Sequence, residues 1–235
     1  MSESKDIYIL CLESSTSICS VALCKNGKTI ATKDSTEGQK HSKWMTVFIQ
    51  DLLAEAKIEI NKLHAVAVSQ GPGSYTGLRV GYSIAKGICF RLGIPMIEIP
   101  SLEALGTSLS IEEEESFVIV STIDARRMEV YWRVINHKGE CLQETEAHIY
   151  SETSFDAFLA YSKIFVIGDG AEKMNELSLD PHVENKISIK KHLTFATNLS
   201  SIAFYKYENG LFVDTAYSTP FYLKSPNITK SKKTI

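Results

Sequence analysis

Apolar residues form short runs, or recur at helical spacing, in a regular order along the first half of the chain. Short runs bounded by polar turns are typical of strands, and Asn26-Gly27 is a strong hairpin signal. Apolar residues three and four positions apart predict helices. The expected elements are strands at 7–12, 18–25 and 28–33, a helix at 41–56, a strand at 65–68, a helix ending near 92, a strand at 94–99 and a short helix from 101.

The second half of the chain repeats this order. Its expected elements are strands at 117–123, 128–135 and 140–148, a short helix near 154–162, a strand at 164–167 and a glycine loop from 168. This order, which occurs twice, is three antiparallel strands, a helix, a parallel strand and a helix. It is the order of a duplicated ribonuclease-H-like fold. We therefore predict an α/β protein of the actin-like ATPase superfamily, whose members bind nucleotide in the cleft between two domains.

The boundary between the two domains is expected at an acidic run, residues 112–115. We predict an N-terminal domain at 1–110, joined by a C-terminal helix at about 195–208. A smaller C-terminal domain would span 111–194. The last residues, 224–235, are basic and are expected to be disordered.

The glycine-rich stretch after the strand at 65–68 reads QGPGSYTGLR. Strand, glycine turn and helix is the layout in which the N–H groups of a helix N-terminus face an anion. Gly71 and Gly73 could supply backbone angles that side chains forbid. The spacing fits neither a Walker A loop nor G-x-G-x-x-G, so the loop is either an unusual phosphate site or a structural turn.

Several polar residues are candidates for a nucleotide or phosphate loop around this turn. The turn of the second hairpin, with Asp124, Arg126 and Arg127, could also face the cleft and contact a phosphate or a partner, or could be an ordinary salt-bridged turn. The predicted loop residues are Ser14, Ser15, Gly71, Gly73, Ser74, Thr76, Arg79, Gly168 and Asp169.

The helix after the glycine loop is apolar over about 200° of its circumference, about twice what one core requires. The helix at 41–56 shows a similar excess. An exposed apolar surface of this size usually marks an interface. The predicted partner surface comprises His41, Trp44, Met45, Phe48, Val80, Ile84 and Ile88.

Composition and charge argue against some classes of function, nucleic-acid binding through a basic surface and membrane insertion among them. The chain has 235 residues, 44% of them hydrophobic, and a net charge of −3, so no global basic field indicates nucleic-acid binding. Its five cysteines form no CxxC motif, as expected for reduced thiols. With no apolar run of membrane-spanning length and no signal-peptide layout at its start, we expect a cytoplasmic protein without membrane contact.

Five motifs together resemble the TsaB (YeaZ) family of bacterial proteins. They are LCLESSTSICSVAL, HSKWMTVFIQDLL, QGPGSYTGLRVG, IPSLEAL and DARRMEVYW, with weaker echoes at GDGA and PFYLKSP. The resemblance implies a part in making threonylcarbamoyladenosine next to the anticodon of tRNA. It implies a non-catalytic scaffold that binds the catalytic paralogue TsaD as a heterodimer. The ATPase TsaE would assist, and this chain would contact tRNA only indirectly, through the complex.

The same resemblance implies that this chain alone binds no cofactor and that ATP or ADP could bind in the complex. It leaves open whether the chain alone is a monomer or a homodimer. Family members usually carry Asp-Thr-Ser where this chain has Glu13-Ser14-Ser15. The catalytic paralogue carries two histidines four apart on a helix, whereas here Met45 stands four residues after His41.

Two enzymatic alternatives remain open at this point. One is a metallopeptidase or glycoprotease, which would need paired metal ligands. None of the six histidines lies three to five positions from another, so the local metal signature is missing. The other is a small-molecule kinase, which would need a catalytic carboxylate and a full phosphate cradle. We therefore predict no metal site and no catalytic residue.

Overall fold

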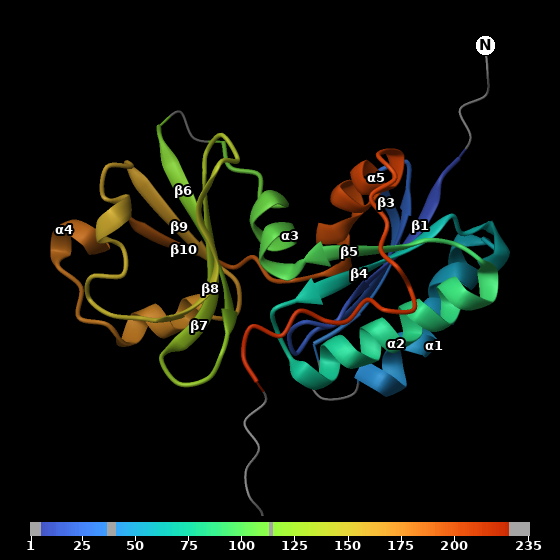
Figure 1. Cartoon of the computed structure of the whole chain (residues 1–235). Coiled ribbons are helices and arrows are strands. Elements are labelled where there is room, and N and C mark those ends of the chain that lie inside the picture. Colours follow the sequence, from blue (N-terminus) through green and yellow to red (C-terminus); the bar gives the residue numbers. More distant parts are fainter. Residues whose placement is uncertain (1–5, 37–40, 113–114, 226–235) are drawn as a thin grey trace, which may run out of the picture.

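The computed structural model of the protein describes residues 6–36, 41–112 and 115–225, with the side chains of residues 41 and 42 left out. Two lobes lie side by side, each built on a five-stranded sheet (Figure 1). The first sheet consists of β1 (Tyr8–Glu13), β2 (Cys19–Lys25), β3 (Lys28–Ser35), β4 (Ala65–Gly71) and β5 (Met96–Pro100), in the spatial order β3-β2-β1-β4-β5. The first three strands are antiparallel, and β4 and β5 run parallel to β1.

The second sheet repeats this plan strand for strand. It consists of β6 (Phe117–Asp124), β7 (Glu129–Asn136), β8 (Cys141–Ile149), β9 (Lys163–Ile167) and β10 (Ile187–Lys190), in the order β10-β9-β6-β7-β8. Again the first three strands are antiparallel, and β9 and β10 are parallel to β6. The predicted duplicated ribonuclease-H-like fold is therefore confirmed.

Alternation of side chains along β1 and β2 divides the first lobe into two cores. Leu10, Leu12 and Val21 face a layer formed by α1 (His41–Ala56) and α2 (Tyr75–Leu92). Ile9 and Cys11 face the opposite layer, formed by a 3-10 helix (Ala196–Leu199) and α5 (Ser200–Glu208). Figure 1 shows α1 and α2 on one face of this sheet and α5 on the other. The C-terminal helix thus covers the N-terminal sheet.

Helix α3 (Ser101–Thr107) lies between the lobes and contacts both sheets. In the second lobe, one sheet face packs against α3 through Leu105, Ile135 and Phe165. The other face carries an aromatic cluster around Trp132, with Phe158 in edge contact with it.

One prediction for the second lobe is wrong, and one strand was not predicted. The helix expected at 154–162 is only a 3-10 turn (Asp156–Phe158), because Phe155 and Phe158, three positions apart, both turn inward onto Trp132. The chain after β9 forms a second 3-10 helix (Ala171–Glu176) and the short α4 (Pro181–Glu184) before adding β10, a strand not predicted. Its four residues are too few to show a period.

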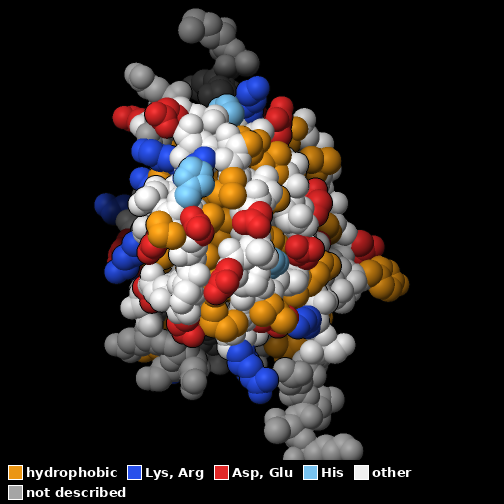
Figure 2. Space-filling model, turned by 90° about the vertical axis from the view of Figure 1, so that its left-hand side faces the viewer, with side chains coloured by type: hydrophobic (Ala, Val, Ile, Leu, Met, Phe, Trp, Pro, Cys, Tyr) orange, Lys and Arg blue, Asp and Glu red, His pale blue; other side chains and the backbone are white. Residues whose placement is uncertain are grey.

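No helix in the described part of the chain is long and apolar enough to cross a membrane. Figure 2 shows the outer end of the second lobe, where acidic, basic, hydrophobic and uncharged side chains are intermingled. Lys224 and Ser225 of the predicted disordered tail lie within the described structure, and residues 226–235 lie outside it.

Candidate functional site

A cleft of about 940 Å³ lies between the two lobes. One wall is the turn after β1 with the N-terminal turn of α2, and the other is the β6–β7 turn with the loop after β9. The end of the described chain forms a third side. The lining residues are 15–17, 72–77, 80, 123–126, 129, 131, 169 and 221–225.

The turn after β1 is closed on itself rather than open to the cleft. Glu13 is 1% exposed, and its Oε1 accepts a hydrogen bond from the Ser15 N–H at 2.5 Å. The Ser14 N–H donates to Ser69 Oγ at 3.3 Å. Burial raises the pKa of the Glu13 carboxyl. Glu13 therefore shapes its own turn, and of the three residues only Ser15 lines the cleft.

The glycine loop presses directly onto this turn. The Ser74 N–H donates to the Ser15 carbonyl oxygen at 2.6 Å, and a Cβ at Gly73 would overlap that same oxygen. A Cβ at Gly77 would overlap the Ser14 carbonyl oxygen. Gly73 is thus needed for close approach, and the expectation that it adopts a forbidden backbone angle is wrong. That expectation holds for Gly71, with φ of 110°.

Helix α2 starts at the cleft. Ser74 caps it by accepting from the Gly77 N–H at 3.2 Å, while Tyr75 and Thr76 lie at the cleft wall, where early helical N–H groups can meet an anion. Arg79 does not join them. Its Nη1 donates to Tyr75 Oη at 3.2 Å and its guanidinium lies over the Tyr75 ring, so Arg79 supports a lining residue but is not itself part of the lining.

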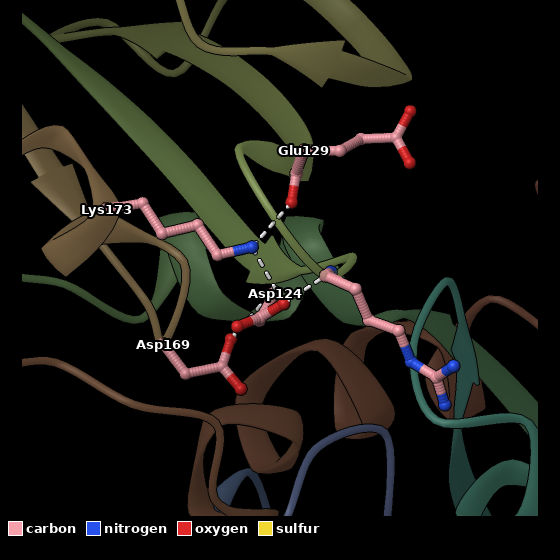
Figure 3. A network of polar contacts seen from close by, with 5 residues as sticks. Asp124, Glu129, Asp169 and Lys173 are labelled. Carbon is pink, nitrogen blue, oxygen red and sulfur yellow. Dashed lines mark hydrogen bonds and ion pairs between the residues drawn. The ribbon is translucent and has the colours of Figure 1, made fainter. Parts of the chain in front are cut away.

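The wall contributed by the second lobe is an ion-paired network (Figure 3). Asp169 Oδ1 accepts from the Asp124 N–H at 2.9 Å. Lys173 Nζ donates to Asp124 Oδ1 at 2.8 Å and to the Glu129 carbonyl oxygen at 2.7 Å. Burial raises the pKa of Asp169. Asp124 is salt-bridged and also lines the cleft, and its contact with a phosphate or a partner stays a prediction.

The backbone of this wall is conformationally special. Arg126 and Arg127 have φ of 76° and 52°, backbone angles that residues other than glycine rarely adopt. The Arg126 N–H donates to Asp124 Oδ1. Gly168 has φ of 98°, and a Cβ there would overlap the Thr122 carbonyl oxygen. Gly168 is therefore a structural turn residue and does not line the cleft, whereas Asp169 does.

The cleft thus gathers part of the predicted loop set: Ser15, Gly73, Ser74, Thr76 and Asp169. Ser14, Gly71, Arg79 and Gly168 lie outside its lining. Sequence reasoning missed Tyr131 and residues 221–225. The weak match of PFYLKSP to the family pattern was the available signal for residues 221–225. The motif did not indicate which surface of the protein this segment covers.

The predicted partner surface is divided by the fold. Met45 is fully buried in the first-lobe core, so its assignment to an exposed surface is wrong. Val80 is half-buried and lines the cleft. Trp44 and Phe48 stack with ring centroids 5.7 Å apart, and with Ile84 and Ile88 they pack, half-buried, on the core. His41 begins α1, but its side chain lies outside the described structure.

The exposed face of α2 carries different residues from the predicted ones. Arg79, Ser83 and Gly87 are exposed along it, and Phe90 is 90% exposed. A Cβ at Gly87 would meet nothing within 4 Å. Because Ser83 and Gly87 are small, another helix could approach this face closely. Sequence reasoning missed Phe90, whose outward position follows from its place three residues after Gly87 and seven after Ser83 on one helix face.

Within the described residues, no three His, Cys, Asp or Glu side chains lie close enough together to hold a metal ion. The described cysteines are free, and burial raises the pKa of Cys19, Cys24 and Cys89 to about 11. These thiols therefore stay protonated near neutral pH.

Two repeats of one sheet topology around an interlobe cleft define a protein of the actin-like ATPase class. The family model described as "TsaD: tRNA N6-adenosine threonylcarbamoyltransferase" matches residues 33–232. The chain belongs to this family, and within it to the TsaB (YeaZ) group.

Named relatives support this assignment. The tRNA threonylcarbamoyladenosine biosynthesis protein TsaB of Haemophilus influenzae is 35% identical over 57% of this chain and 56% of its own length. The protein of the same name from Escherichia coli is 26% identical over 92% of this chain and 94% of its own length. The chain is thus related to proteins of tRNA threonylcarbamoyladenosine biosynthesis.

Solved structures agree with the fold. YeaZ from Pseudomonas aeruginosa superposes with a TM-score of 0.75 at 26% identity, covering 92% of this chain and 100% of that one. A more distant structure, the activator of 2-hydroxyisocaproyl-CoA dehydratase from Clostridium difficile, gives a TM-score of 0.51 at 10% identity. It covers 87% of this chain and 97% of its own, and it supports the fold alone.

Proposed function

We propose that this protein is a non-catalytic scaffold subunit for threonylcarbamoyladenosine modification of tRNA. It binds the catalytic paralogue TsaD through the outer surface of α1 and α2. TsaE and tRNA join through the complex, and the same surface forms a homodimer when the chain is alone. Homodimer and heterodimer then compete.

The observation that carries this proposal is the outer face of α2. The small exposed residues Ser83 and Gly87 leave room for a second helix on this face, and packing there would bury Phe90, which is 90% exposed in the chain alone. The half-buried Trp44 and Phe48 extend it onto α1. Helices of a paralogue with the same fold could pack on this layer as its own α1 and α2 do.

The composition of the cleft supports a non-catalytic role. Each carboxylate in the cleft lining already has a partner: Asp124 pairs with Lys173, Asp169 accepts from the Asp124 N–H, and Glu129 pairs with Lys224. Glu13, behind the lining, holds its own turn. On this proposal the isolated chain binds no nucleotide, and ATP or ADP binds only in the complex. Titration calorimetry of ATP with magnesium, on the chain alone and on the complex, tests this part.

Gly87→Arg tests the partner surface. Its Cβ meets nothing, and arginine is a better helix former than glycine by about 0.5–1 kcal/mol, so the variant should remain folded and gain stability. The added side chain should nevertheless weaken TsaD binding at least tenfold, and tRNA modification by the reconstituted complex should fall with it. Ser201→Arg, on an exposed position of α5 across the sheet, is the matched control and should change neither.

Full TsaD affinity in folded Gly87→Arg would exclude this surface. Loss of modification with unchanged TsaD affinity would instead assign α2 to another step of the reaction. Modification activity in the chain without TsaD would overturn the non-catalytic role itself.

A further inference from the structure

The segment from Val213 to Ser225, here called the C-terminal strap, runs from the edge of the first sheet to the cleft. Val213 pairs with Met96 at the start of β5, and its N–H donates to the Met96 carbonyl oxygen at 3.1 Å. Lys86 Nζ, on α2, donates to the Ala216 carbonyl oxygen at 3.1 Å. Figure 1 shows the strap in red beside α2, ending near the second lobe. Its last five residues line the cleft.

The strap is fixed firmly to the first lobe near the glycine loop. The Phe221 N–H donates to the Gln70 carbonyl oxygen at 2.8 Å. The Phe221 carbonyl oxygen lies 2.6 Å from where a Cβ at Gly71 would stand, so only glycine admits the strap there. The Tyr222 ring packs on Tyr75, with centroids 4.7 Å apart. These anchors combine backbone hydrogen bonding, shape and ring packing.

A single polar contact ties the strap to the second lobe. Lys224 Nζ forms an ion pair with Glu129 Oε1, and no other hydrogen bond or ion pair joins strap and second lobe within the described residues. The Lys224 side chain is 48% exposed and that of Glu129 20%. The Glu129 backbone is itself held, because its carbonyl oxygen accepts from Lys173 Nζ and from the Ala125 N–H. The receiving end is therefore rigid, and the ion pair is the weak link.

The remaining polar links between the lobes gather where the chain crosses from one to the other, before β6 and after β10. There Ser108 Oγ and His192 Nε2 lie 2.9 Å apart, and the Thr16 and Thr194 hydroxyl oxygens 2.8 Å apart. Helix α3 packs on both sheets in the same region. This part of the molecule can serve as a hinge.

We propose that the strap is a releasable latch across the interlobe cleft, with the Lys224–Glu129 ion pair as its opening end. When the pair breaks, the strap stays on the first lobe, the lobes separate about the hinge, and the cleft opens. An exposed ion pair is weak and screened by salt, so the closed form is favoured only about two- to fivefold by this contact. This inference does not rest on the proposed scaffold function.

Lys224→Met removes the charge and keeps most of the side-chain bulk. Hydrogen exchange should become about two- to fivefold faster both in residues 223–225, at the free end of the strap, and in the β6–β7 turn at 124–131. The Phe221 N–H, which stays bonded to Gln70, should exchange as slowly as before, and the radius of gyration from X-ray scattering should rise. Raising the salt concentration should produce the same changes in the wild type and none in the variant. Lys33→Met, which removes the Lys33–Glu55 ion pair within the first lobe, is the matched control and should change neither segment.

The charge-swapped double variant, Lys224→Glu with Glu129→Lys, should restore slow exchange in both segments while each single reversal speeds it. Unchanged exchange in Lys224→Met would overturn the latch. So would faster exchange confined to the strap, because the strap would then be a passive tail. Equal salt-induced opening in Lys224→Met and wild type would show that another charge pair closes the cleft.

Discussion

The β1–β2 turn of the first lobe and the β6–β7 turn of the second occupy equivalent places in the repeat, yet different forces hold them. The first is buried, uncharged apart from Glu13, and covered by the backbone of the glycine loop. The second faces the cleft, carries Asp124, Arg126 and Arg127, and is held by Lys173. The β1–β2 turn is packed closely because Gly73 and Gly77, which press on it, have no side chains. The β6–β7 turn is held by the ion pair between Asp124 and Lys173. Backbone topology was duplicated, but the chemistry of the two cleft walls was not.

Substitution of the glycine loop should give the largest effect. In Gly73→Val the new Cβ meets the Ser15 carbonyl oxygen, which belongs to the backbone and cannot move aside as a side chain could. We expect a loss of about 3 kcal/mol or more in the free energy of unfolding, measured by urea denaturation. Gly87→Ala on the same helix is the control and should gain about 1 kcal/mol. A neutral Gly73→Val would mean that the two segments are not pressed together.

Removing the cation of the second turn should have an intermediate effect. Lys173→Met removes one donor from Asp124 and one from the Glu129 carbonyl oxygen, which keep the Arg126 and Ala125 N–H groups, and the lysine side chain is only 13% exposed. Because Asp124 is 46% exposed and can be solvated, the expected loss is about 1–2 kcal/mol rather than the cost of a buried charge. Lys25→Met, at an exposed pair with Asp6, should cost much less. Equal losses in the two variants would contradict the comparison.

The buried acid of the first turn should make stability depend on pH. Burial raises the folded-state pKa of Glu13, so the folded protein binds a proton that the unfolded chain releases. Stability is then full below the unfolded pKa, near 4.3, and falls as the pH rises toward the raised folded pKa. Glu13→Gln should flatten this decline when unfolding is measured between pH 4 and pH 7. An unchanged slope would show that Glu13 is not the responsible group.

Backbone strain in the second turn should give the smallest effect. Arg126→Gly relieves a φ of 76° at the cost of a more flexible unfolded chain, for a net gain of about 0.5 kcal/mol. Arg126→Ala removes the same side chain but keeps the strain, so it separates the two contributions. A thermal melt in which glycine is no more stable than alanine would show that the turn is unstrained.

Local sequence determined the strands, the long helices and the order of elements, because side-chain periodicity and turn residues act over a few positions. The helix at 41–56 and the repeated strand order follow directly from them. Periodicity also indicated that α1 and α2 were too apolar for one core, but it did not tell which residues of each helix the rest of the lobe covers. The wrong assignment of Met45 has that cause.

Tertiary structure alone decided which distant residues meet. Gly73 is needed because the Ser15 backbone, far away in sequence, passes against it. Lys224 forms an ion pair with Glu129, 95 positions away in sequence, and Lys173 forms one with Asp124, 49 positions away. The first and third of these contacts join loops within one lobe, and the Lys224–Glu129 contact also depends on how the two lobes are oriented. No short-range pattern encodes either kind of contact. The sequence by itself therefore determined the order of elements in each lobe, and the packing of the lobes decided which residues line the cleft.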